Sequence, residues 1–327
     1  MRFTISRFAA LAVAIGLALA PRVGVAETKV TMHLDWLFNG YHAPFLVAVE
    51  KGWYEEAGLD VTVRAGKGSF DSVRAVGAGN AEFGFPDAAT AVKSISEGIP
   101  LTMAAVFLQE TPMGIVSFAE RGIAKPKDLE GRTMGNVPIA STAKVMPAFL
   151  NKNGVDIGKV TLVEQTFATA VPSVLAGEVD AGQGYVFGEY LAIKNGGGGR
   201  AVNWISFAEN GIQMYSNGIA VNNDFLAANP GAVRSFVQAS IRGLDWTIKN
   251  PAAAIDIMAQ HTTTKKEVLL EQLTVAIPLM NNKAAMDNGL GSMSAEKWKE
   301  TQDIMIEYGG QKERVPDDKA WTSQFLN

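Results

Sequence analysis

The sequence predicts an α/β protein of two lobes, each a mostly parallel β-sheet flanked by helices, with a ligand cleft between the lobes. Strand-like apolar runs alternate with helix-like segments along most of the chain, which is typical of parallel strands joined by helices. A helix-and-strand motif occurs twice in similar form, which indicates two related lobes. About three hundred residues follow the first apolar segment, enough for two domains.

The composition is that of a globular chain and argues against several functions. Hydrophobic residues make up 47% of the chain and charged residues 19%, which suits a large core. The net charge of −4 offers no basic field for nucleic acid. With no cysteine and three scattered histidines, His33, His42 and His261, no spacing matches a zinc site. No serine nucleophile elbow or phosphate loop is present either, so we expect no catalytic residue, metal or cofactor.

Residues 1–26 have the organisation of a secretory signal peptide. Arg2 and Arg7 form a short basic region, the apolar stretch 8–20 follows, and small residues favour cleavage after Ala26. The alternative is a membrane anchor, but a spanning helix needs about 20 apolar residues. Later apolar runs are also too interrupted for stable membrane insertion, and no cysteine could carry a lipid. We therefore expect a protein exported to the periplasm.

The first lobe begins with a strand, an irregular loop and a helix. Pro44 suits the first turn of that helix and Gly52 its end. Further on, Ser69 and Asp87 are the expected N-caps of two more helices. The expected order is a strand ending near His33, a helix at 44–51, a strand at 60–63, a helix at 69–79, a strand at 82–85, a helix at 87–98 and a strand at 101–107.

The second lobe repeats this alternation. Ser141 is the expected N-cap of its first helix, and Pro172 is expected in the first turn of its second. We expect a strand ending near Asn136, a helix at 141–153, a strand at 160–163, a helix ending at Ala176, a strand at 181–185, a helix at 187–195, and mainly helices after Asn222, including 230–249 and 251–260.

Lobe one would hold 27–117 and 219–327 and lobe two 118–218, with hinge crossings near Ser117 and Gly218.

The repeated motif links the two lobes. The segment 73–84 resembles the segment 171–182, because in each an apolar helix face ends at a glycine and an acidic residue precedes a glycine of the next strand. Each unit would deliver a loop to the shared cleft, 85–87 from one lobe and 184–186 from the other.

Side chains at the ends of these strands are the candidates for ligand binding. In open α/β sheets the ligand lies beyond the carboxyl ends of the strands. Trp36 could form a stacking wall for a flat ligand or belong to the core. Ser69, Asp87 and Ser141 could serve only as helix caps, and Glu189 only as a solvated helix residue. The predicted ligand-binding residues are Asp35, Trp36, Asn39, Tyr41, His42, Ser69, Asp87, Asn136, Ser141, Tyr185, Glu189 and Tyr215.

These segments together resemble the NMT1/THI5-like family of periplasmic solute-binding proteins. The resemblance is carried by Asp35-Trp36, Tyr41-His42-Ala43-Pro44, Lys51-Gly52-Trp53-Tyr54, the segment 125–132 at the start of the second lobe, and the return strand at 215–225. It implies the two-lobed type II periplasmic binding protein fold and delivery of small organic nutrients to ABC importers. In the thiamine-pyrimidine branch, residues at the positions of Trp36 and His42 line the site.

Two departures qualify this resemblance. The family's pyrimidine synthases carry a cysteine cluster before the return strand, whereas 211–218 contains no cysteine. Some thiamine-branch members also have a glutamate near 184–186, where this chain has none.

The resemblance implies a monomeric receptor that presents a planar heteroaromatic nutrient, such as a thiamine pyrimidine precursor, to a permease and its ATPase. The alternatives are a sulfonate or taurine receptor, a sensor subunit that presents its ligand to a membrane kinase, and a synthase-like enzyme, which the missing cysteines disfavour.

Overall fold

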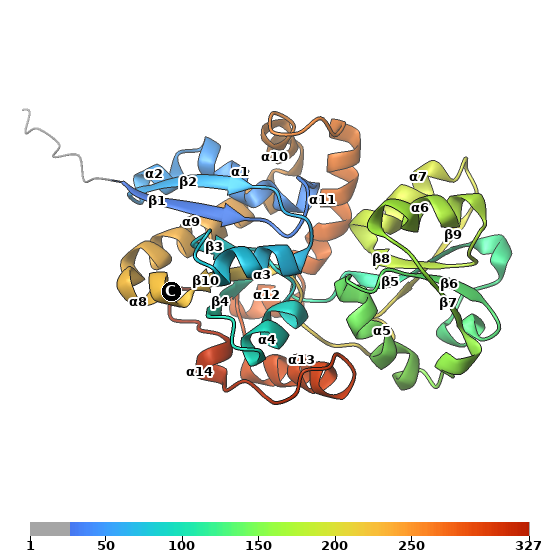
Figure 1. Cartoon of the computed structure of the whole chain (residues 1–327). Coiled ribbons are helices and arrows are strands. Elements are labelled where there is room, and N and C mark those ends of the chain that lie inside the picture. The colour runs from blue at the N-terminus through green and yellow to red at the C-terminus, as the bar shows by residue number, and fades with distance from the viewer. Residues whose placement is uncertain (1–26, 327) are drawn as a thin grey trace, which may run out of the picture.

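The computed structural model describes residues 27–326, which form two lobes side by side (Figure 1). The predicted signal peptide, 1–26, lies outside the described residues. No helix in the described part of the chain has the length and apolar character to span a bilayer. The chain passes from the first lobe to the second between Val106 and Met113, and returns between Ser206 and Gly218.

The first lobe is built on a five-stranded sheet. In spatial order its strands are β2 (Leu59–Arg64), β1 (Thr28–His33), β3 (Phe83–Gly84), β10 (Gly218–Asn222) and β4 (Leu101–Val106). β1 runs parallel to β2 and β3, whereas β10 runs antiparallel to β3 and β4. All six residues of β4 are buried, as expected for a strand covered on both faces.

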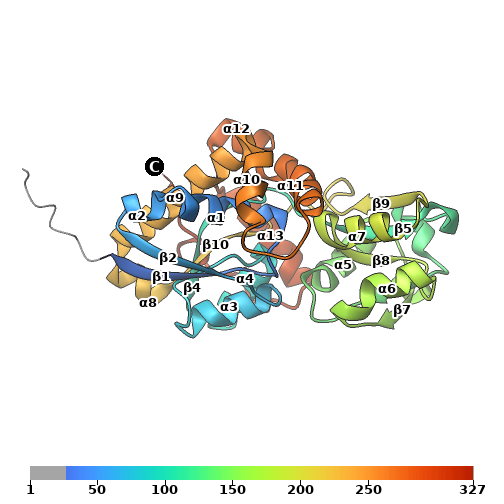
Figure 2. The ribbon, with the colours of Figure 1, turned by 90° about the horizontal axis from the view of Figure 1, so that it is seen from above.

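Helices cover both faces of this sheet. They are α1 (Ala43–Glu50), α2 (Trp53–Glu56), α3 (Ser69–Gly77) and α4 (Ala88–Ser96), joined after the second lobe by α8 (Asn223–Ala228), α9 (Pro230–Lys249), α10 (Pro251–Met258), α11 (Lys266–Met280), α12 (Lys283–Asn288), α13 (Ala295–Glu307) and α14 (Asp317–Ala320). Figure 2 shows α1 and α9 on one face of the sheet and α3 on the other. The first lobe is therefore a sheet sandwiched between two helical layers.

The second lobe repeats the topology of the first. Its elements are β5 (Met113–Phe118), η2 (Ala119–Arg121), η3 (Pro126–Leu129), β6 (Thr133–Asn136), α5 (Ser141–Lys152), η4 (Ile157–Lys159), β7 (Thr161–Glu164), α6 (Phe167–Ala176), β8 (Gly182–Tyr185), the π-helical turn η5 (Val186–Tyr190), α7 (Leu191–Gly196) and β9 (Val202–Ser206). β6 pairs parallel with β7, and β5 pairs antiparallel with β8 and β9. A parallel bridge between Met134 and Ala181 joins the two sets of strands.

The resulting order, β7-β6-β8-β5-β9, is the counterpart of β2-β1-β3-β10-β4. In each lobe one reversed strand separates the last strand from the other three. The repeated sequence motif falls on α3 and β3 in one lobe and on α6 and β8 in the other. The prediction of equivalent helix–strand units is therefore confirmed.

Several local expectations were wrong. α3 is preceded by Gly68 and α5 by Ala140, so Ser69 and Ser141 are first helical residues and not N-caps. α6 begins at Phe167, which places Pro172 inside the helix. β5 and β9 were not predicted.

The position of the first hinge crossing also differs from the prediction. Ser117 lies within β5, which pairs with β8 and β9 of the second lobe. The first crossing therefore precedes β5, because a strand paired on both sides cannot serve as a hinge. The wider division of the chain into lobes at the predicted residues stays a prediction.

Candidate functional site

A cleft of about 550 Å³ lies between the two lobes. The first lobe contributes the loop after β1, the start of α3 and one face of α4. The second lobe contributes the starts of α5 and α6, the end of β8 and the turn η5. Of the predicted ligand-binding residues, the cleft is lined by Asp35, Trp36, Asn39, Tyr41, Ser69, Ser141, Tyr185 and Glu189.

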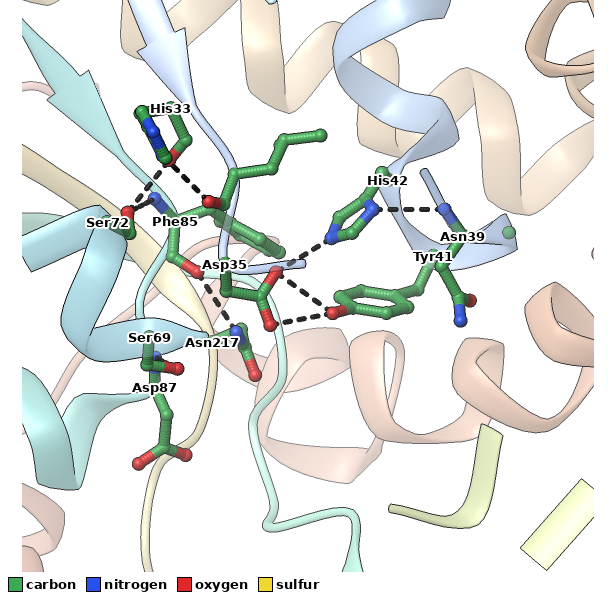
Figure 3. A network of polar contacts seen from close by, with 12 residues as sticks. His33, Asp35, Asn39, Tyr41, His42, Ser69, Ser72, Phe85, Asp87 and Asn217 are labelled. Atoms are coloured by element: carbon green, nitrogen blue, oxygen red, sulfur yellow. Dashed lines mark hydrogen bonds and ion pairs between the residues drawn. The ribbon is translucent and has the colours of Figure 1, made fainter. Parts of the chain in front are cut away.

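Asp35, which lines the cleft, organises the loop after β1 (Figure 3). Tyr41 Oη lies 2.9 and 2.7 Å from the two carboxylate oxygens, and Nε2 of His42 lies 2.8 Å from Oδ1. The backbone N–H of Asn39 donates to Nδ1 of His42 at 3.2 Å. Because Nδ1 accepts this bond, Nε2 carries the ring proton and donates to Asp35. Burial raises the pKa of the Tyr41 hydroxyl, and the neighbouring Asp35 raises it further.

This network gives His42 a positioning role. Its ring is fully buried and does not line the cleft, although the resemblance implied direct contact with a ligand. As the last residue of the turn η1 (Gly40–His42), it links the carboxylate of Asp35 to the backbone N–H of Asn39 and so holds the loop in one conformation.

Aromatic rings from both lobes face the cleft. The Trp36 ring lies 4.8 Å from that of Phe167, the first residue of α6, at an interplanar angle of 63°. Tyr41 packs against Phe187 of the second lobe at 4.2 Å. Both phenylalanines line the cleft, but the sequence indicated neither, because no periodic pattern distinguishes them from core residues. Trp36 lies on the cleft lining, and its contact with a ligand stays a prediction.

Two polar side chains on the cleft lining are available to a ligand, Asn39, which is buried, and Glu189, which is half-buried. Asn39 is 7% exposed, and its Oδ1 has no hydrogen-bond partner among the described residues. Glu189 accepts a hydrogen bond from the backbone N–H of Tyr185 through Oε2 at 2.8 Å, and burial raises its pKa. A Cβ on Gly184 would lie 2.2 Å from this Oε2, so Glu189 depends on a glycine at that position. Unpaired polar groups on a cleft wall favour ligands that can pair with them.

Asp87 lies behind the cleft wall. It caps α4 as predicted, because its Oδ1 accepts from the backbone N–H of Ala89 at 3.0 Å. Its Oδ2 accepts from the hydroxyl of Ser216 at 2.8 Å and lies 3.5 Å from the hydroxyl of Tyr185 across the cleft. Burial raises the pKa of Asp87 to about 6. The Ser69 hydroxyl in turn accepts from the backbone N–H of Asp87 at 3.0 Å.

The two remaining predicted residues lie away from the cleft lining. Asn136 accepts from Nε2 of Gln183 within the second lobe at 2.6 Å. Tyr215 is buried 5.4 Å from the Trp298 ring, and its hydroxyl accepts from the backbone N–H of Ser294. Both residues contribute to packing around the strands that lead to the cleft.

Four cationic side chains on the cleft lining were not predicted. They are Lys67, Arg74, Lys93 and Lys144. Each lies in or just before a helix that borders the cleft, where a cation usually indicates only a solvated helix face. Only the tertiary arrangement shows that they line the same cleft. The described residues contain no cluster of histidine and acidic side chains that could hold a metal ion.

Two lobes of matching strand order around a cleft define the fold of periplasmic solute-binding proteins. The periplasmic aliphatic sulphonate binding protein SsuA from Escherichia coli superposes with a TM-score of 0.74 at 14% identity, over 90% of this chain and 92% of that one. The sequence model described as NMT1/THI5 like matches residues 39–254. The chain therefore belongs to the NMT1/THI5-like family.

Sequences of named relatives align with most of this chain. The riboflavin-binding protein RibY of Chloroflexus aurantiacus is 27% identical over 94% of this chain and 89% of its own length. The formylaminopyrimidine-binding protein of Halalkalibacterium halodurans is 24% identical, with 91% of each chain covered. A 4-amino-5-hydroxymethyl-2-methylpyrimidine phosphate synthase of Aspergillus parasiticus is 28% identical over 71% of this chain and 70% of its own.

Proposed function

We propose that this protein is the periplasmic solute-binding component of an ABC importer and captures a small planar heteroaromatic nutrient. The observation that carries the proposal is the pair of aromatic rings, Trp36 and Phe167, that meet across the cleft from different lobes. The same cleft is lined by the polar side chains of Asn39, which is buried, and Glu189, which is half-buried. The names of the riboflavin-binding and formylaminopyrimidine-binding relatives support the same ligand class.

In this proposal the protein works by closing its lobes around the ligand. An aromatic face gains about 0.5–1.5 kcal/mol from favourable ring geometry beyond the burial of its area. Selectivity comes mainly from the buried Oδ1 of Asn39, since a ligand that leaves it unpaired loses about 1–3 kcal/mol. The chain segments between β4 and β5 and between β9 and β10 absorb the dihedral changes of closure. A monomeric closed form then docks on the permease, whose ATPase drives uptake.

We propose a receptor and not an enzyme. Relatives include synthases, so membership of the family does not decide between binding and catalysis. The synthases' cysteine cluster, implied by the family resemblance, has no counterpart in this cysteine-free sequence. Mass spectrometry of riboflavin and 4-amino-5-hydroxymethyl-2-methylpyrimidine after incubation with the protein separates the alternatives. We expect both compounds to be recovered unchanged, and a new product would contradict the proposal.

The ligand class can be tested by thermal shift and calorimetry. We expect riboflavin or 4-amino-5-hydroxymethyl-2-methylpyrimidine to raise the melting temperature, and taurine to leave it unchanged. Stabilisation by taurine or alkanesulfonates alone would assign the protein to sulfonate uptake and overturn the heteroaromatic proposal.

Two variants locate the binding in the cleft. Trp36→Ala is expected to weaken affinity about tenfold or more, because stacking on an aromatic side chain contributes about 1–3 kcal/mol. Asn39→Leu is expected to weaken binding without loss of stability, since its Oδ1 has no partner within the described residues to lose. Trp53→Ala is the matched control, because Trp53 lies against Arg242 outside the cleft lining. Equal affinities for the Trp36 and Trp53 variants would contradict the proposed site.

A further inference from the structure

The first crossing between the lobes is attached to a segment near the C-terminus. The backbone N–H of Gln109 donates to the carbonyl oxygen of Leu279 at 2.9 Å, and its Nε2 donates to the carbonyl oxygen of Ser292 at 3.0 Å. Nδ2 of Asn282 donates to Oε1 of Glu110 at 2.8 Å. These three partners lie between the end of α11 and the start of α13, in the first lobe.

The return crossing is attached to the same segment through Tyr215. Its backbone N–H donates to Oγ1 of Thr301 at 3.2 Å, and its hydroxyl accepts from the backbone N–H of Ser294 at 2.9 Å. Its ring packs against Trp298, and the residue is 3% exposed. The main chain, the hydroxyl and the ring of Tyr215 are therefore all held by α13 and the turn before it.

Lys297 of α13 lies close to both crossings. Its Nζ is 5.3 Å from the centroid of the Tyr215 ring, where a cation is attracted to the aromatic face. Burial lowers the pKa of Lys297, and the nearby carboxylates of Glu110 and Glu300 act in the opposite direction. Residues 279–301 thus hold the first-lobe ends of both crossings, and we call them the hinge clamp.

The second lobe holds the other end of each crossing. In the first crossing, the carbonyl oxygen of Pro112 accepts from the backbone N–H of Val186, the first residue of η5, at 2.9 Å. In the return crossing, the backbone N–H of Ile212 donates to the carbonyl oxygen of Phe207, just after β9, at 2.9 Å. Ile212 is also buried.

Two short pieces of chain remain between these anchors, Glu110–Thr111 and Gln213–Met214. Among the described residues, no main-chain hydrogen bond joins either piece to a lobe. Their φ and ψ angles can therefore change while the hydrogen bonds on both sides of them stay intact. Dihedral changes at a few such residues are enough for hinge closure.

We propose that the hinge clamp confines bending to these two pieces and thereby sets the equilibrium between the open and closed forms, with Tyr215 as its central positioning residue. This inference rests on the proposed function, but its residues do not line the cleft. Without the anchor at Tyr215, more residues of the return crossing rotate freely in the open form. Closure must then order them again at a cost in conformational entropy, so the clamp favours the closed form.

Spin labels measure the bending directly. The chain has no cysteine, so Lys159→Cys and Lys249→Cys place one label on the exposed surface of each lobe. In this labelled parent, Tyr215→Phe combined with Thr301→Val removes two acceptors of the clamp with little change in side-chain volume. Without ligand, we expect pulsed electron paramagnetic resonance to give a broader distribution of distances between the labels in the double variant than in the parent.

Ligand affinity supplies a second readout. The double variant is expected to bind riboflavin or 4-amino-5-hydroxymethyl-2-methylpyrimidine, whichever the wild type binds, about three- to tenfold more weakly, although neither Tyr215 nor Thr301 lines the cleft. Tyr215→Phe alone keeps the ring and the bond to Thr301. We expect it to give smaller changes in the same direction, and it tests the inference if the double variant does not fold.

Tyr54→Phe is the matched control. It removes a buried hydroxyl that lies 2.7 Å from Oγ of Ser240, between α2 and α9 of the first lobe. We expect it to lower the melting temperature while the distance distribution and the affinity stay at their wild-type values. A distribution as narrow as the parent's in both clamp variants would overturn the inference, as would an equal broadening in Tyr54→Phe. Because the distances are measured without ligand, failure of both compounds to bind would overturn the proposed function alone.

Discussion

At the residue scale, Asp35 occupies most of the polar side chains of its own loop. The loop after β1 is rich in side chains that could hydrogen-bond a ligand, yet Tyr41 and His42 direct their polar atoms to Asp35. Asn39 is the exception, since its buried Oδ1 has no partner among the described residues. The neighbouring residues hold the loop rigid, and Asn39 remains free to pair with a ligand.

The buried carboxyl group of Asp87 makes the stability of the protein depend on pH. Burial raises its pKa from 3.8 to about 6 in the folded protein. The folded state therefore binds more protons than the unfolded state between these values, and the free energy of unfolding falls as the pH rises through this window. This difference between the folded and the unfolded pKa corresponds to about 3 kcal/mol of unfolding free energy. The protein has this additional stability in full below the unfolded pKa, and has lost it above the folded pKa.

The variant Asp87→Asn tests this dependence, because asparagine is an equally good N-cap but cannot ionise. Between about pH 4 and pH 7 we expect the unfolding free energy of the wild type to fall by about 3 kcal/mol relative to the variant. Urea denaturation across this range gives the difference. Asp180→Asn is the control, because hydrogen bonds from Thr133 lower the pKa of Asp180 and no such fall is expected. A constant difference between wild type and Asp87→Asn would refute the prediction.

At the scale of elements, the turn η5 serves both lobes. The sequence predicted an ordinary helix from Phe187, but the wider π-helical turn spans Val186–Tyr190. It directs the Phe187 ring against Tyr41 of the first lobe and places Glu189 on the cleft lining. The hydrogen bond from the backbone N–H of Tyr185 to Glu189 holds the turn to the end of β8.

The packing of α1 on α9 depends on Gly243. A Cβ at this position would lie 2.2 Å from the carbonyl oxygen of Pro44, in the first turn of α1. Gly243→Ala is therefore expected to separate the helices and cost about 1–3 kcal/mol of unfolding free energy. Because α1 directly follows His42, the affinity for ligand should fall as well.

Gly231→Ala, in the first turn of α9, is the matched control. A Cβ there meets nothing within 4 Å, so we expect unchanged stability or a gain of up to about 1 kcal/mol. Denaturant titration of both variants measures the contrast. Equal stability of the two proteins would show that the helices can move apart at no cost.

At the scale of the whole molecule, several polar contacts join the lobes. The hydroxyl of Thr90 lies 2.9 Å from that of Ser141 across the cleft. Glu271 of α11 pairs with Lys194 of α7 at 2.9 Å, and Tyr308 donates to Asn151 at 2.8 Å. An exposed ion pair such as that of Lys194 with Glu271 contributes only about 0.2–1 kcal/mol. A ligand that touches both lobes can therefore shift the balance toward the closed form.

Cross-linking tests this closure. The chain has no cysteine, so Thr90→Cys combined with Ser141→Cys introduces one possible disulfide. We expect a bound ligand to accelerate its formation, and the oxidised protein to retain that ligand through gel filtration until a reductant is added. Mass spectrometry detects the cross-link, and the single-cysteine variants are the controls. Equal rates with and without ligand would argue against closure around the ligand.

Local patterns along the chain were enough to predict the class of fold, the repeated helix–strand unit and the loop that carries Trp36. Strand alternation and helix capping are encoded by near neighbours, so the N-cap at Asp87 could be predicted as well. β5 and β9 were missed, although the pairing of β5 decides where the chain crosses between lobes.

Only the tertiary structure decided which side chains meet. Trp36 and Phe167 lie far apart in the sequence and touch because the lobes face each other. Tyr215, which was predicted to bind ligand, is buried by Trp298 and Ser294, which lie far away in the sequence. His42 is also buried, away from the cleft lining. The cations of the cleft lining come from separate helices of both lobes, and they come to the same cleft only in the folded molecule. The physical reason is that a binding site depends on distances between segments, whereas the sequence encodes directly only the preferences within them.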